Sequence, residues 1–186
     1  MSVDTYLMQI GWDVIRNFIN DWREEPLRWG YEIEIQAEIY GRLSKVYDLL
    51  GEGIFQGNYE NYGCEQLKNA QILNRVSCET KDRTDRKMPD LIIWEDADFH
   101  NYTMEKDWPM LFVCEIKVTN RFVSEAKRIQ DDEEKVKNIL LRKRSKYGCL
   151  LVFCFKKEGQ FECPPMLSKG ECKRIDIPIS SKVGMP

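Results

Sequence analysis

The chain has 186 residues, of which 42% are hydrophobic and 32% charged, and its formal net charge is −3. These values fit one globular domain with a real core, and the mild acidity argues against a protein that coats DNA regardless of sequence. The longest apolar stretches, such as Cys149–Phe155, are too short to cross a bilayer, and the N-terminus lacks the features of a secretory signal. We therefore expect a cytoplasmic protein without a membrane contact.

The first half of the chain predicts two amphipathic helices. Apolar residues recur at spacings of three and four from Asp4 to about Trp22 and again from about Tyr31 to Leu50. Residues 51–66 are rich in Gly, Asn and Tyr and predict a loop or a short irregular strand. Ile72–Cys78 has the pattern of a strand.

The second half predicts strands around a third helix. Leu91–Trp94 (LIIW) and Met110–Val118 (MLFVCEIKV) are apolar runs short enough for buried strands, and Val123–Lys143 has the spacing of a helix. The strongest strand signal is CLLVFCF at 149–155, and Lys173–Ile177 predicts a last strand. Strands that are apolar on both faces and flanked by long helices indicate an α/β layered structure.

Histidine and cysteine usage narrows the possible chemistry. The only histidine, His100, lies in a polar stretch that looks like a loop, so a Ser–His–Asp or Cys–His mechanism would depend on this one residue. The seven cysteines form no C-x-x-C pair, and their odd number indicates reduced thiols rather than a disulfide framework or a zinc site. We expect any chemistry to depend on carboxylates and lysine, with or without a metal.

Charged residues interrupt the two central predicted strands. Asp90 directly precedes LIIW, and Glu115 and Lys117 follow LFVC in the next strand. Because side chains alternate along a strand, Glu115 and Lys117 share one face and Ile116 points to the other. Burying an acid and an amine is unfavourable unless they are paired or bind a metal. A salt bridge between Lys117 and an acid on the neighbouring strand and a metal site are both compatible with this pattern.

The combined pattern P-D, 24 intervening residues, then E-I-K resembles the signature of the PD-(D/E)XK nuclease superfamily, the fold of many restriction and repair enzymes. The predicted order of elements over about residues 30–156 is similar to the α-β-β-β-α-β core of that family. The resemblance implies one domain over residues 1–186 with a restriction-endonuclease-like core of three layers, a central mixed β-sheet flanked by helices. Residues 1–29 and 157–186 lie outside the resemblance.

Two helical segments extend the resemblance. Glu32 and Gln36 lie one turn apart and resemble the E-x-x-x-Q helix of several branches of the family. Asp131 or Asp132 with Lys135 resembles the D-x-x-K region of some members.

The resemblance implies a metal-dependent phosphodiester hydrolase. Asp90 and Glu115 would hold one or two Mg²⁺ ions, which Mn²⁺ can replace, and the Ile116 carbonyl would be a further ligand. Lys117 would lie beside the attacking water and the scissile phosphate.

The resemblance also implies an acid from the preceding helix at the same site. Glu32 is the first expectation, with Glu34 and Glu38 as rivals, and a solvated helix face remains the alternative for each of the three. Gln36 is expected to line the cleft and contact substrate, although a surface glutamine is an equal alternative.

Nucleic acid is the expected partner, with DNA favoured over RNA. Arg142 and Lys143 belong to a basic cluster that would contact phosphate, although such clusters are more often solvated faces. A two-fold dimer would suit a nuclease with one site per chain that cuts both strands. Two other functions remain open: a catalytically inactive nuclease-fold protein that binds nucleic acid or an assembly, and an α/β interaction protein whose Asp, Glu and Lys form a structural ion network.

Overall fold

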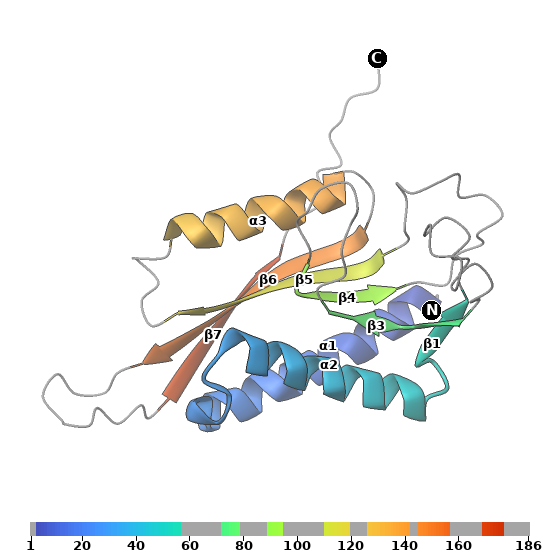
Figure 1. Ribbon diagram of the computed structural model, residues 1–186, viewed down its shortest axis with the longest axis horizontal. Helices are drawn as coiled ribbons and strands as arrows, with labels where there is room; N and C mark the ends of the chain where they lie inside the picture. The colour runs from blue at the N-terminus through green and yellow to red at the C-terminus, as the bar shows by residue number, and fades with distance from the viewer. Residues whose placement is uncertain are drawn as a thin grey trace, which may run out of the picture.

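The structure is a computed structural model that describes residues 3–56, 72–78, 89–94, 110–119, 126–141, 145–156 and 169–176. Within this part of the chain, three α-helices and a five-stranded mixed sheet form a mixed α/β fold (Figure 1). None of the described helices is both long and apolar enough to cross a membrane. The described cysteines are all free thiols.

The helices agree closely with the sequence predictions. The helical elements are α1 (Val3–Glu24), the short 3₁₀ helix η1 (Pro26–Trp29), α2 (Glu32–Leu49) and α3 (Ala126–Leu141). Pro26 begins η1 because its fixed φ and missing N–H suit the first position of a helical turn. Gly51, with φ of 74°, follows the end of α2 in a conformation that favours glycine.

The strands form two sheets. The strands are β1 (Ile54–Gln56), β2 (Ile72–Asn74), β3 (Val76–Ser77), β4 (Leu91–Trp94), β5 (Met110–Thr119), β6 (Ser145–Lys156) and β7 (Lys169–Asp176). β1 and β2 form an antiparallel pair, and the larger sheet has the order β3-β4-β5-β6-β7. Neighbours in the larger sheet are antiparallel except β5 and β6, which are parallel and lie on either side of α3 in the sequence. A parallel pair needs such a crossover connection.

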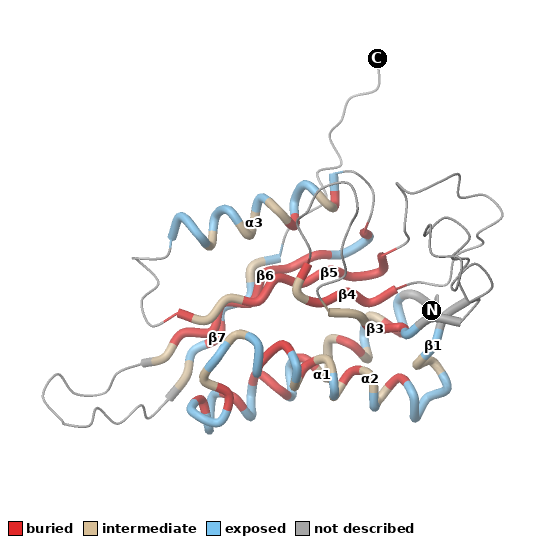
Figure 2. The backbone as a smooth tube through the Cα atoms, viewed as in Figure 1, coloured by how far each residue is buried: buried red, intermediate tan, exposed pale blue. Residues whose placement is uncertain are grey.

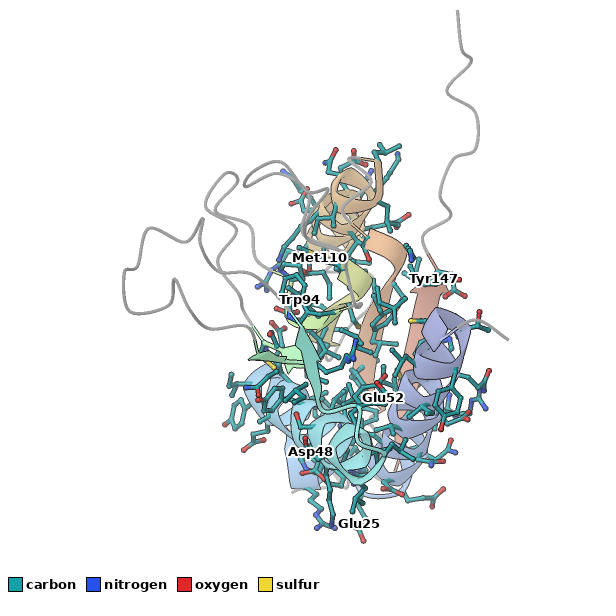
Figure 3. All side chains as sticks on the ribbon, turned by 90° about the vertical axis from the view of Figure 1, so that its right-hand side faces the viewer. Glu25, Asp48, Glu52, Trp94, Met110 and Tyr147 are labelled. Carbon is teal, nitrogen blue, oxygen red and sulfur yellow. The ribbon has the colours of Figure 1, made fainter. Side chains whose placement is uncertain are left out.

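The helices cover the larger sheet on both faces. Figure 1 shows α1 and α2 on one face and α3 on the other, and the buried residues in Figure 2 are concentrated on the strands between them. Side chains of β4 alternate between the two faces of the sheet: Leu91 packs in the cluster with α1 and α2, and Ile92 packs with α3. Trp94 and Met110, paired on neighbouring strands, lie toward α3, whereas Asp48 lies in the layer of α1 and α2 (Figure 3).

The predicted strand Ile72–Cys78 is wrong in one respect, since the structure divides it between the two sheets. The division occurs at Arg75, whose side chain is 1% exposed. Its guanidinium donates hydrogen bonds to the carbonyls of Glu52, Ile54 and Trp94 and pairs with the Glu52 carboxylate. A buried guanidinium needs these acceptors, so the chain bends at Arg75 to supply them.

The central strands β4 and β5 differ in length, and the candidate site lies where the longer strand β5 extends beyond β4. The ladder between β4 and β5 ends at the pair Leu91 and Cys114, while β5 continues to Thr119. Within the described residues, the last five residues of β5 therefore pair with β6 alone. We call this end of β5, next to the start of β4, the notch.

Candidate active site

The notch brings together Asp90 and the Glu115-Ile116-Lys117 segment, as the sequence predicts. Continuing the antiparallel register by one residue places Asp90 opposite Glu115, where side chains of facing residues share one face. Asp90 does not continue the ladder through its backbone. Instead its Oδ2 accepts a hydrogen bond from the backbone N–H of Ile116 at 2.7 Å. The carboxylate is thereby fixed at the edge of β5 beyond the end of its ladder with β4.

Helix α2 approaches the notch with its first two turns. Gln36, only 4% exposed, donates a hydrogen bond from Nε2 to the Asp90 carbonyl at 2.6 Å. One turn earlier, Glu32 Oε2 lies 3.2 Å from Lys117 Nζ. Residues four apart on a helix share a face, which explains why both reach the same site. Gln36 thus has a contact that positions the Asp90 backbone, and its expected contact with substrate stays a prediction.

The other two glutamates of α2 have different partners. Glu34 accepts a hydrogen bond from the Tyr31 backbone N–H at 3.1 Å, which caps the helix, and Glu38 pairs with Arg42 at 2.8 Å. Among the three rivals, Glu32 is the one that the structure places beside Lys117.

Helix α3 supplies two residues that the sequence prediction did not include in the site. Asp132 Oδ2 lies 3.3 Å from Lys117 Nζ, and Lys135 Nζ lies 2.7 Å from Glu115 Oε1. Their spacing of three on one helix places both on the face toward the sheet. The D-x-x-K pattern was the signal that could have identified them.

Lys117 connects the two helical layers. Its ammonium contacts Glu32 of α2 and Asp132 of α3, which belong to helices on opposite faces of the sheet. This contact requires the notch, because a fully paired neighbouring strand would separate the two helices at this level. The early end of the β4 ladder therefore allows residues from three elements to meet.

Burial dominates the electrostatics of the two central carboxyl groups. Burial and the charge of Asp90 raise the pKa of Glu115 to about 8, although the Lys135 ammonium lowers it. Burial likewise raises the pKa of Asp90 to about 6, against the hydrogen bond from Ile116 and the charge of Lys135. The protein therefore disfavours two negative charges here, and a cation in the notch would stabilise them.

The surroundings of Lys117 favour its charged form, whereas those of Asp90 and Glu115 disfavour theirs. Burial lowers its pKa, but Glu32 and Asp132 raise it by more, so the net pKa is raised. The side chain is therefore an ammonium at neutral pH. It can stabilise negative charge or orient a water molecule, but it cannot act as a general base there.

The residues in contact carry a surplus of negative charge. Four carboxyl groups (Asp90, Glu115, Glu32 and Asp132) meet two ammonium groups (Lys117 and Lys135), and the fully ionised set has two excess negative charges. That surplus equals the charge of one divalent cation.

The oxygen atoms of the notch fit a hard divalent ion, provided that water completes its coordination shell. No three side chains of His, Cys, Asp or Glu among the described residues gather closely enough to hold a metal by themselves. Mg²⁺ is commonly held by one or two carboxylates with water completing its shell, and Asp90 and Glu115 can supply these, with the Ile116 carbonyl as a further oxygen. Glu115 Oε1, fully shielded from solvent, has the Lys135 ammonium as its ionic neighbour.

Two predicted substrate-binding residues, Arg142 and Lys143, lie outside the described residues, and their roles stay predictions. Comparison of the chain with protein-family models, with curated protein sequences and with solved structures found no match.

Proposed function

We propose that the chain is a divalent-metal-dependent nuclease that hydrolyses phosphodiester bonds of nucleic acid, with DNA as the first substrate to test. The observation that carries the proposal is the convergence of Asp90, Glu115 and Lys117 in the notch. Two carboxylates and an ammonium, largely removed from water, are the groups that phosphodiester hydrolysis needs.

The order and direction of the elements support the same proposal. From α2 to β6, leaving aside β1 and β2, the chain runs helix, three antiparallel strands, helix and a parallel strand. This is the α-β-β-β-α-β order that the sequence resemblance implies, with Asp90 directly before its second strand and E-I-K on its third. A restriction-endonuclease-like fold is therefore part of the proposal.

Each residue has a definite role in the proposed reaction. When bound at Asp90 and Glu115, Mg²⁺ would lower the pKa of a water molecule and offset charge on the phosphate. The N–H of Ile116 holds the Asp90 carboxylate, and Gln36 holds the backbone on which that carboxylate sits. Lys117, kept protonated by Glu32, orients the water and stabilises the charge that develops on phosphate.

A structural ion network is the second candidate, and one observation favours it. Lys117 is paired at both sides, to α2 and to α3, as a residue that joins two layers would be. In that case the charged groups contribute to folding alone, and the chain binds other macromolecules or none. The catalytically inactive nuclease-fold alternative makes the same prediction for cleavage but keeps binding to nucleic acid.

Cleavage assays distinguish these candidates. Labelled single-stranded, duplex and branched DNA and RNA are incubated with the protein and Mg²⁺, Mn²⁺ or EDTA. The Glu115→Gln and Lys117→Met variants are compared with Glu134→Gln, a control on the exposed side of α3 that pairs only locally with Lys137. Metal-dependent cleavage that both site variants lose and the control retains supports the nuclease. If folded wild-type protein cuts none of these substrates, the proposal fails, and retained binding to nucleic acid would then identify the inactive nuclease fold.

A further inference from the structure

The contact between Lys135 and Glu115 lies where a metal would have to bind. Lys135 Nζ is 2.7 Å from Glu115 Oε1, and Glu115 is one of the two carboxylates of the proposed metal site. The Glu115 side chain is 4% exposed and that of Lys135 is 15% exposed, so the contact is largely closed to solvent. A divalent ion bound to the same carboxylate would lie close to the Lys135 ammonium, and two cations at such close range repel each other.

The geometry of this contact favours exchange over a permanent structural bridge. Glu115 Oε1 is fully buried, and its contact with Lys135 joins the side chains of two different elements, β5 and α3. Lysine has a flexible four-carbon stem, and Lys135 extends it from α3 to Glu115, so rotation about the bonds of that stem would move the ammonium away from the carboxylate.

The two lysines of the site differ in this respect. Lys117 is held by Glu32 and Asp132, which are 41% and 22% exposed and belong to the helices. Of these two lysines, Lys135 is the one that contacts a carboxylate of the central pair, and its charge lowers the pKa of Asp90 more than the charge of Lys117 does. Lys135 is thus the cation that compensates the central carboxylates in the protein without metal.

From this placement we infer that Lys135 occupies the cation position of the notch in the metal-free protein and leaves it when a divalent ion binds. The inference rests on the proposed function, since it concerns the same metal site. Lys135 is a positioning residue: it keeps the two central carboxylates together before the metal arrives and competes with the metal for Glu115.

Competition of this kind has a measurable consequence. The apparent affinity for the ion is reduced by the fraction of molecules in which the site is free. Replacing Lys135 with Met, which keeps similar bulk without the charge, removes the competitor. We expect Mn²⁺ to bind Lys135→Met at least about tenfold more tightly than it binds the wild-type protein. Lys135→Arg keeps the charge and can grip a carboxylate with two N–H groups, so we expect severalfold weaker binding.

Titration calorimetry with Mn²⁺ alone, on the full chain and at one pH, tests the inference. The matched control is Lys137→Met, which removes an exposed lysine of the same helix that pairs with Glu134. Tighter Mn²⁺ binding by Lys135→Met and weaker binding by Lys135→Arg, with the affinity of the control unchanged, support the inference. Thermal melting gives a second measure, because Mn²⁺ should raise the Tm of Lys135→Met by more than it raises that of the wild type.

The outcomes separate the inference from the proposed function. If the wild type binds Mn²⁺ at the Asp90 and Glu115 site but Lys135→Met binds it equally or more weakly, the inference is wrong and the nuclease proposal stands. If the wild type binds no Mn²⁺, the metal site and the inference both fail. Should Lys135→Met be too unstable to purify, Lys135→Arg decides alone, and affinity equal to or above the wild type would contradict the inference.

Discussion

The two faces of the five-stranded sheet are packed in different ways. Among the residues that the structure describes, the face under α1 and α2 belongs to an apolar cluster of 21 buried residues, whereas the cluster under α3 has six. Helix α3 itself buries only Val136 and Leu140. The helix with the smaller apolar contribution is the one that brings Asp132 and Lys135 to the site.

Strand β5 contributes both to the large apolar cluster and to the charged candidate site. In β5, Cys114 and Ile116 face the large cluster, while Glu115 and Lys117 alternate with them and contact α3. Alternate residues of this segment therefore point to opposite faces of the sheet, the apolar ones into the large cluster and the charged ones toward α3. Because the large cluster supplies most of the apolar packing, the face under α3 can hold buried charged groups that contribute little to the stability of the fold.

Matched truncations in the two clusters should show the largest difference in stability. Leu43→Ala removes a fully buried side chain of the large cluster, and Leu140→Ala removes the corresponding one under α3. Large-to-small core substitutions cost about 2–5 kcal/mol, with more where the surroundings cannot relax. We expect Leu43→Ala near the upper end and Leu140→Ala near the lower end in urea unfolding. Equal losses would mean that the two faces do not differ in this way.

The stability of the metal-free protein should fall as the pH rises from about 4 to about 8. Folding raises the pKa of Glu115 from 4.5 to about 8 and that of Asp90 from 3.8 to about 6. In this window the folded protein binds more protons than the unfolded chain, so the free energy of unfolding decreases with pH. We expect a loss on the order of 4 kcal/mol relative to Glu115→Gln, which lacks the main titrating group. Parallel pH profiles of the two proteins would contradict the assigned burial of Glu115.

Lys117→Met should reduce cleavage by about a hundredfold or more, in the range found when a group that stabilises transition-state charge is removed. Met keeps most of the bulk of the Lys117 side chain, so the effect of this substitution on folding should be much smaller than that of Leu43→Ala. Single-turnover kinetics with saturating Mg²⁺ measure the chemical step. A change in unfolding free energy with unchanged cleavage would instead assign Lys117 to the structural ion network.

Asp132→Asn should have the smallest effect among these variants. It removes one of the two carboxylates that hold Lys117 and leaves Glu32 in place. Both acids are partly exposed, and such pairs contribute less than about 1 kcal/mol. We expect a loss of about 0.5 kcal/mol in urea unfolding. A loss several times larger would show that the bridge between α2 and α3 is a main support of the fold.

Local patterns in the sequence predicted much of the fold. The apolar spacing of α1 and α2 and the apolar runs of β4, β5 and β6 are signals that neighbouring residues contain. The division of residues 72–78 was not predictable in this way. It depends on acceptors for Arg75 that come from Glu52, Ile54 and Trp94, which are distant in sequence.

The candidate site shows the same limit. Alternation along β5 predicted that Glu115 and Lys117 share a face, and the spacing of Glu32 and Gln36 was a usable signal for choosing among the glutamates of α2. The pairing of Lys135 with Glu115 was not foreseen. It depends on how α3 lies across the sheet, a result of packing between elements rather than of local pattern.

A crystal structure determined with Mn²⁺, with anomalous scattering used to locate the ion, tests the central claim most directly. We predict an ion within about 2.5 Å of carboxylate oxygens of both Asp90 and Glu115. The same map should show the Lys135 ammonium withdrawn from Glu115. A notch without an ion in crystals that contain Mn²⁺, or an ion bound only elsewhere on the chain, would contradict the claim that these carboxylates form a metal site.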